Sequence, residues 1–230
     1  KYNVDFRTLS QLRGDPPATF ERIGQAFLKA KKFELALTAF RKAGETKKAK
    51  SGNLAYNLAL TQLEMDKAEE ALTTLQSYFD EQRQSKGREA YELLERILGK
   101  LNKSGELLGR LEKISEADNR NTTLQYFLAE KYRAAKSFDK AETLLLAAIK
   151  SDPDGPGHIV LAGVYRDLNN PEQLLKALAK AAERSLGDAG DNPNGADVLN
   201  DEIEALAKDS GLVDTLVSIG DKKKDAGELD

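Results

Sequence analysis

The chain has 230 residues, of which 40% are hydrophobic and 32% charged, so it can bury the core of one elongated domain or two small ones. Its 35 basic and 38 acidic residues give a formal net charge of −3, which provides no bulk attraction to nucleic acid or anionic membranes. The absence of cysteine excludes disulfides, thiolate zinc sites and cysteine nucleophiles, and no apolar run approaches the roughly 20 residues of a membrane-spanning helix.

The first sixteen residues precede the first clear helical pattern. Leu9 and Leu12, followed by Asp15-Pro16-Pro17, look like the end of a helix that closes a repeat. We therefore expect residues 1–16 to be the end of a preceding repeat or an N-terminal extension. The chain starts on Lys1 without a signal-type apolar stretch, which we interpret as a processed or excised fragment of a soluble protein. Cysteine usage leaves the compartment open between the cytoplasm and a periplasmic or exported location.

A repeat of 33 to 36 residues dominates the rest of the chain. Five residue pairs mark it: Ile23-Gly24, Leu58-Ala59, Leu94-Glu95, Leu128-Ala129 and Leu161-Ala162. A second landmark follows each pair at a fixed offset: Ala36 with Phe40, Ala71 with Leu75, Leu107 with Leu111, Ala141 with Leu145, and Leu174 with Leu178. Apolar residues at i, i+3, i+4 and i+7 around each landmark predict a helix, a short turn and an antiparallel helix in every unit.

Small residues recur at the landmarks, where the two helices of a unit would cross. Residues such as Gly24 and Ala141 let helix axes approach the lower end of about 8–10 Å. The third unit has Glu95 and Leu107 at these places, and the fifth has Leu174. We expect those two interfaces to be looser or differently angled.

The first unit, Phe20-x2-Ile23-Gly24-x2-Phe27 with Ala36-x3-Phe40, resembles the tetratricopeptide repeat family. The fourth unit shows the same likeness in Leu128-Ala129-x2-Tyr132 with Ala141 and the closing Asp152-Pro153. The resemblance covers residues 17–184. It implies an all-α, right-handed superhelical solenoid of antiparallel helix pairs, with five repeats in residues 17–185.

A loop and a short helical region follow the fifth unit. Gly, Asn and Pro residues from Gly187 to Gly195 predict the loop, and a helical pattern then resumes. We expect residues 196–230 to form a C-terminal helical cap or a partial sixth repeat. The segment beginning at Gly190 looks like a calcium loop, but Gly190 and Asp201 stand where acidic and Glu ligands are required, so no calcium site is predicted.

No motif in the sequence predicts catalysis, a cofactor or a metal. The single histidine, His158, has no second histidine or cysteine to join it in a metal site, and we expect it to line an interhelical groove. Glycine-rich phosphate-binding loops are absent from the sequence. Asn102 and Asn121 begin glycosylation-type triplets, which have meaning only in a secretory host. We therefore predict that the chain is not an enzyme.

The resemblance also implies a partner, because proteins of this family bind protein or peptide segments on the concave surface that their first helices form. Transferring the surface positions of the family gives these partner-binding residues: Gln25, Asn53, Tyr56, Asn57, Glu92, Arg96, Tyr126, Glu130, Arg133 and Arg166. The function predicted is a non-catalytic scaffold or adaptor for a protein or peptide, without nucleic-acid binding or membrane insertion. The alternative is a helical docking module excised from a larger enzyme or a secretion or assembly protein. The sequence does not indicate the oligomeric state.

Two features bear on the charge of the partner. Gln25 and Asn57 match the amides of a carboxylate clamp found in some relatives, but Glu21, Glu89 and Leu93 replace its cations, which argues against that clamp.

Arginines recur on successive first helices at positions 96, 133 and 166, so they suggest a grip on an acidic segment. The simpler interpretation is that Arg96 pairs with Glu92 and Arg133 with Glu130 on a solvated face, and helical spacing favours it.

Overall fold

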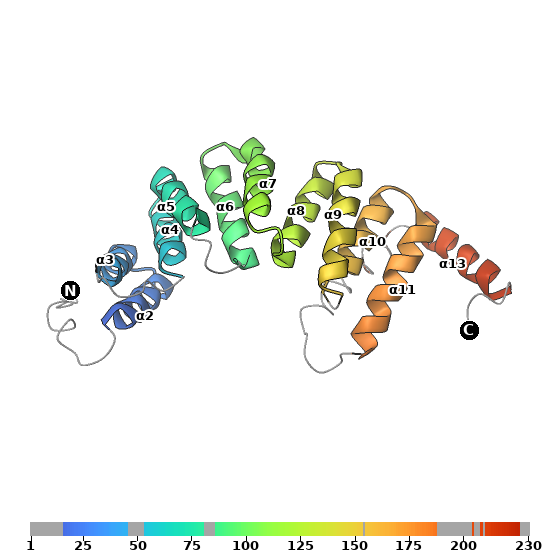
Figure 1. The fold of residues 1–230 in the computed structure, drawn as a ribbon, viewed down its shortest axis with the longest axis horizontal. Coiled ribbons are helices and arrows are strands. Elements are labelled where there is room, and N and C mark those ends of the chain that lie inside the picture. Colours follow the sequence, from blue (N-terminus) through green and yellow to red (C-terminus); the bar gives the residue numbers. More distant parts are fainter. Residues whose placement is uncertain are drawn as a thin grey trace. The chain divides into compact units, whose positions relative to one another are not determined.

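The computed structural model describes residues 16–45, 53–80, 86–153, 155–187, 204, 208 and 210–225. All regular structure in these residues is helical, which confirms the predicted all-α fold (Figure 1). The helices are α2 (Pro16–Lys29), α3 (Phe33–Gly44), α4 (Leu54–Glu64), α5 (Ala68–Asp80), α6 (Arg88–Lys100), the 3-10 helix η1 (Ser104–Glu106), α7 (Leu107–Ala117), α8 (Thr122–Ala134), α9 (Phe138–Ser151), α10 (Gly157–Asp167), α11 (Pro171–Gly187) and α13 (Ser210–Asp225).

The helices form two compact units, unit 1 in residues 1–118 and unit 2 in residues 119–230. In unit 1, α2 packs against α3 and α4 against α5, while α6 leads through η1 into α7. In unit 2, α8 packs against α9 and α10 against α11, and α13 contacts α11. The first helices of successive pairs also touch within each unit, because α4 contacts α2 and α6, and α10 contacts α8. These are the antiparallel pairs that the repeat predicts.

Some predicted segments fall outside the described residues. They are most of the N-terminal segment 1–16, the loop after Gly187, the calcium-like segment from Gly190 to Asp201, and part of the C-terminal segment 196–230. None of the helices in the described ranges combines the length and apolar composition that crossing a bilayer requires.

The same tight turn reverses the chain inside every helix pair. One residue of each turn has a positive φ of 52° to 61°, the left-handed conformation: Lys31, Asp66, Asn102, Lys136 and Asn169. The amide of the next residue donates to a carbonyl five residues earlier, at 2.8–2.9 Å: Lys32 to Phe27, Lys67 to Gln62, Lys103 to Leu98, Ser137 to Tyr132 and Asn170 to Tyr165. This bond closes the carbonyl end of the first helix and fixes where the second begins.

Small residues lie where the two helices of a pair cross. The ring of Phe40 occupies the space beside Gly24, since a Cβ at Gly24 would be 2.5–2.8 Å from three ring carbons. Ala129 and Ala141 are fully buried between α8 and α9, and Ala162 is almost fully buried on α10. The helices can approach closely at these crossings because glycine and alanine occupy little space, as the spacing predicts.

The third pair is the loosest, in agreement with its Leu107 and Glu95. Helix α7 buries only Leu107 and Leu111, whereas α3 buries five residues, and η1 separates α7 from the preceding turn. The looseness expected for the fifth pair does not appear. Leu174 is 1% exposed, and α10 packs on α11 as extensively as α8 on α9, because α11 accommodates the larger side chain in its interface.

We predict that Ala141→Leu lowers the free energy of unfolding by about 1–3 kcal/mol through overpacking of the α8–α9 crossing. The matched control is Ala147→Leu, because Ala147 is exposed on the same helix and has room for the added carbons. Urea unfolding followed by circular dichroism measures both variants. Equal stability of the two variants would contradict the proposed packing.

A second prediction concerns the turn between α8 and α9. Lys136 has a φ of 58°, where an L side chain is strained and glycine is not. We expect Lys136→Gly to raise the free energy of unfolding by about 0.5–1 kcal/mol, the relief of strain less the entropy cost of glycine. Lys136→Ala keeps the Cβ and should bring no gain. A gain from alanine equal to that from glycine would show that the lysine side chain, and not the turn geometry, is the cause.

Candidate functional site

The surface of unit 1 brings together predicted site residues from two first helices. Tyr56 lies on α4 and is half-buried, with the exposed Asn53 one turn before it. Glu89, Glu92 and Arg96 lie on one face of α6 because they are three and four residues apart. We call these five residues the Tyr56 surface.

The charged groups of α6 act on the phenol of Tyr56. Burial raises the pKa of Tyr56 most, the charges of Glu89 and Glu92 raise it further, and the charge of Arg96 opposes them. The phenol therefore stays protonated and can donate or accept a hydrogen bond at neutral pH.

A cluster of aromatic rings packs against the Tyr56 ring on its buried side. The Tyr56 and Tyr78 ring centroids are 6.1 Å apart, those of Tyr78 and Phe79 5.8 Å, and those of Phe79 and Tyr91 5.7 Å with the planes nearly parallel. Tyr91 is fully buried and Tyr78 is 7% exposed, so the cluster joins α4, α5 and α6. The ammonium of Lys86 lies 4.1 Å from the Tyr78 ring centroid, in a cation–π contact.

The charged residues of the Tyr56 surface have different partners from those predicted. A nitrogen of Arg96 is 2.7 Å from an oxygen of Glu64 on α4, and Glu92 accepts a 2.8 Å hydrogen bond from Arg88 on its own helix. The interpretation that paired Arg96 with Glu92 was therefore wrong. It considered contacts within one helix only, whereas the arginine reaches the preceding first helix.

Two predicted site residues are buried. Asn57 is 7% exposed and donates from Nδ2 to Oε1 of Glu21 at 3.4 Å, which joins α4 to α2. Tyr126 is 4% exposed, and its hydroxyl donates to the main-chain oxygen of Asp152 at 3.2 Å. Asn57 bonds to the neighbouring repeat and Tyr126 to the end of its own, so both side chains present little surface to a partner. Gln25 is half-buried on α2.

In unit 2 the predicted arginines meet a carboxylate of the fifth repeat. The guanidinium of Arg133 donates to the two oxygens of Asp167 at 2.7 and 3.2 Å, and Arg166 approaches Asp167 at 3.5 Å. Arg133 lies against the backbone of Gly163, in the space that a side chain at that position would fill. Glu130 is half-buried on the same helix as Arg133.

The carboxyl of Asp167 responds to these neighbours. Its partial burial alone would raise the pKa, but the hydrogen bonds and charge of Arg133, with a smaller contribution from Arg166, outweigh burial and hold the pKa below its usual value. The pair therefore stabilises unit 2 when Asp167 is ionised.

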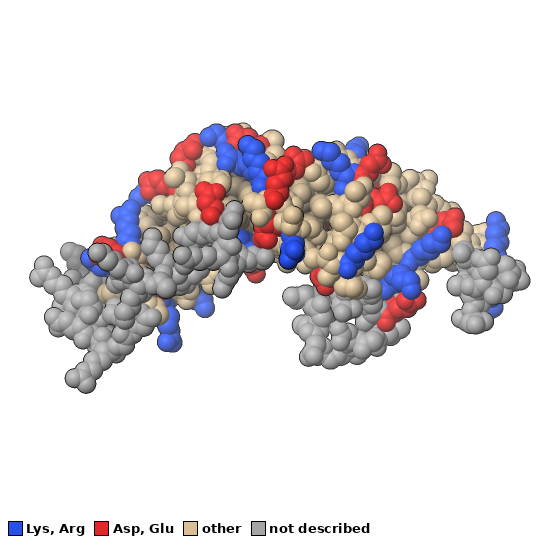
Figure 2. Space-filling model, viewed as in Figure 1, with Lys and Arg blue, Asp and Glu red and all other residues tan. Residues whose placement is uncertain are grey.

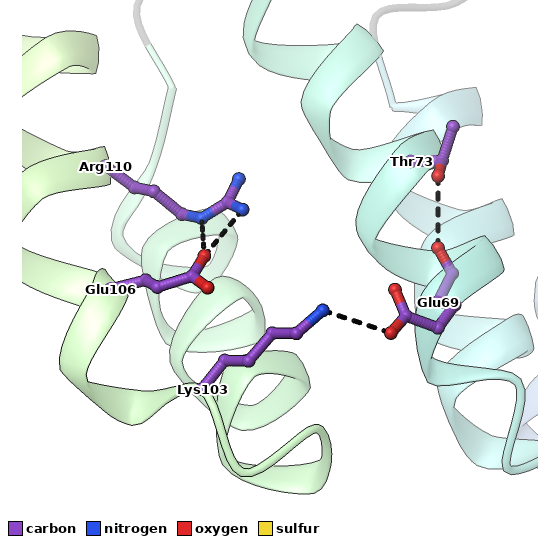
Figure 3. Close-up of polar contacts among 5 residues, drawn as sticks. All are labelled: Glu69, Thr73, Lys103, Glu106 and Arg110. Atoms are coloured by element: carbon purple, nitrogen blue, oxygen red, sulfur yellow. Dashed lines mark hydrogen bonds and ion pairs between the residues drawn. The ribbon is translucent and has the colours of Figure 1, made fainter.

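Ion pairs also cross between the turns of the second and third repeats. Lys103 lies 3.1 Å from Glu69 (Figure 3). Lys100 lies 3.4 Å from Asp66. Both pairs lie beside an open cleft of about 340 Å³ that is lined by Asp66, Lys67, Ala68, Glu69, Glu70, Lys100 and Leu101. Because side chains of both signs line the cleft and form ion pairs across it, these residues join the second repeat to the third.

The remaining sequence candidates have structural places. Asn121 is buried, and its Oδ1 accepts from the Leu124 amide at 3.1 Å as the N-cap of α8, so its amide is not available for glycosylation. His158 is half-buried, and Asn102 is exposed at the turn of the third repeat. On the face drawn in Figure 2, basic and acidic side chains of the described residues are interspersed.

Sequence reasoning missed the aromatic cluster and the ion pairs between repeats. The adjacent aromatic residues Tyr78 and Phe79 at the end of α5 were the available signal for the cluster. The signal for the ion pairs was opposite charges separated by 32 to 34 residues, close to the repeat length, as in Arg96 with Glu64 and Arg133 with Asp167.

We predict that Asp167→Asn lowers the free energy of unfolding by about 1 kcal/mol at pH 7. Because the folded-state pKa is lower than that of the unfolded chain, the advantage of the wild type should disappear as the pH falls below about 4. Urea unfolding at several pH values measures the difference. In an Arg133→Ala background the same substitution should cost much less, because only the weaker contact with Arg166 is left, and an undiminished cost there would contradict the pairing.

Comparisons with known proteins agree on the fold. No model of a protein family matches the chain, and no curated protein matches it. Among solved structures, TTC0263, a thermophilic TPR protein of Thermus thermophilus, is 22% identical over 83% of this chain and 99% of that chain, with a TM-score of 0.51. MamA 41-end from Desulfovibrio magneticus RS-1 is 16% identical over 78% and 100%, with a TM-score of 0.54. Another MamA structure is 17% identical over 75% and 93%, with a TM-score of 0.52. The chain has the tetratricopeptide-repeat fold.

Proposed function

We propose that the chain is a non-catalytic scaffold that binds a segment of another protein on the first-helix side of unit 1, at the Tyr56 surface. The observation that supports this is the 2.7 Å ion pair of Arg96 with Glu64, which sets the α6 face of Glu89, Glu92 and Arg96 beside the helix that carries Tyr56. Ring, amide and charged groups on two successive helices offer several kinds of contact to an extended segment.

The support beneath the Tyr56 surface favours recognition of a partner. The rings of Tyr78, Phe79 and Tyr91 fix Tyr56 in place, so little side-chain freedom is lost when a partner packs on it. A half-buried tyrosine on a rigid base is also the residue type that contributes most at protein interfaces.

The titratable groups of the described residues argue against catalysis. The pKa values of Tyr56, Tyr78 and Tyr165 are all raised, so these phenols are weaker acids and stay protonated at neutral pH. Tyr165 donates a 2.7 Å hydrogen bond to Glu142, and Asp167 is held by Arg133, so packing and pairing account for both shifts. None of these groups combines a free acid or base with a closed pocket.

The experiment uses peptides of twelve random residues, selected for binding to the whole chain. A photo-crosslinking residue is introduced as Asn53→p-benzoylphenylalanine on the Tyr56 surface. The matched control is Gln76→p-benzoylphenylalanine, because Gln76 is equally exposed but lies on the second helix α5.

We expect the selected peptides to crosslink at position 53 and not at position 76, as identified by mass spectrometry. Crosslinking at position 76 alone would place the binding surface on the second helices. It would contradict the proposed function, as would the absence of any selected peptide.

A further inference from the structure

The charges of the first-helix side of unit 1 are mostly neutralised by the chain itself. Arg96 is paired with Glu64 at 2.7 Å, and Glu92 with Arg88 at 2.8 Å. Glu21 is 8% exposed and accepts a hydrogen bond from Asn57. Ion pairs therefore neutralise Arg96 and Glu92, and burial withdraws Glu21 from the surface.

Glu89 differs from these groups. Its side chain is exposed in the first turn of α6, and among the described residues it has neither an ion pair nor a hydrogen bond. Arg96, seven residues later on the same face of α6, bonds to Glu64 of α4 at 2.7 Å, so this face borders the helix that carries Tyr56. The charge of Glu89 accordingly raises the pKa of Tyr56 and of Tyr78, after burial. The Tyr56 surface therefore keeps one carboxylate without an ion pair among the described residues, near a half-buried ring.

A carboxylate beside a ring is the combination that recognises an organic cation. The face of a tyrosine ring attracts ammonium and guanidinium groups, and a carboxylate adds a charge-assisted hydrogen bond. The cluster already holds one such group, since the Lys86 ammonium lies 4.1 Å from the Tyr78 ring centroid. An acidic partner side chain would instead be repelled by Glu89, and Arg96 on the same face is already paired with Glu64.

We propose that the partner segment carries a lysine or arginine whose cationic group packs on Tyr56 and pairs with Glu89. This inference rests on the proposed function and specifies the chemistry of the partner. It replaces the grip of the arginines on an acidic segment, because Arg96 and Arg133 are both paired with carboxylates of neighbouring repeats.

The test begins with the sequences of the peptides that crosslink at position 53. We expect lysine or arginine at one fixed place in most of them. Synthetic copies with that residue changed to norleucine, which keeps the length and removes the charge, should bind about two- to fivefold more weakly in fluorescence anisotropy.

The variants Glu89→Gln and Glu34→Gln then separate the site from a general charge effect. Glu34 is the matched control, because it is exposed in the first turn of α3 and has no ion pair among the described residues. Like Glu89, it interacts with the positive end of its helix dipole, so both substitutions remove the same interaction. Glu89→Gln should weaken binding of the lysine or arginine peptide about two- to fivefold, whereas its norleucine copy should bind both variants equally.

Three results would overturn the inference while leaving the proposed function intact. They are crosslinking at position 53 by peptides that are acidic at the fixed place, crosslinking there by purely apolar peptides, and an equal effect of Glu89→Gln and Glu34→Gln. Failure of the proposed function has a different signature, since no peptide would then crosslink at position 53.

Discussion

The rest of the structure depends on a turn that is repeated five times. In each helix pair one residue takes the left-handed conformation, and the next amide closes the end of the first helix. The second helix must therefore run antiparallel to the first and turn a fixed face toward it. Only then do Gly24 and Phe40, or Ala129 and Ala141, meet at the crossing. In unit 1 the same arrangement sets α4 beside α2 and α6, and so creates the surface on which Tyr56 and Glu89 lie.

The cost of the turn explains its sequence. An L residue at positive φ loses about 1–2 kcal/mol, and Asn or Asp loses less because its side chain bonds locally. Three of the turns use Asp66, Asn102 and Asn169, but two use lysine. The burial that the turn makes possible, including the fully buried Ala36 and Phe40 after Lys31, outweighs this strain. Packing therefore determines where each turn lies. The residue types that tolerate the left-handed conformation, Asp and Asn, occupy three of the five turns.

The sequence predicted the fold well because its period sets it. Steps of 33 to 36 residues between landmark pairs match the spacing of the left-handed residues in the turns. The site was harder to predict because repeat positions indicate which helix face a residue occupies, but not what stacks on that face. Asn57 and Tyr126 are on the predicted side and yet buried by the neighbouring repeat. Arg96 bonds to a residue 32 positions earlier, which no pattern within one helix indicates.

The charge preference of a repeat surface follows from what the repeats leave unpaired. Arginine reaches across about one repeat length and binds a carboxylate of its neighbour, as Arg96 does in unit 1 and Arg133 in unit 2. A count of first-helix arginines therefore overestimates the positive charge available to a partner. An exposed carboxylate that has no ion pair among the described residues, such as Glu89, then adds negative charge to the surface. Since ring and carboxylate at this place come from different repeats, the stacking of α6 on α4 creates a preference that neither repeat has alone.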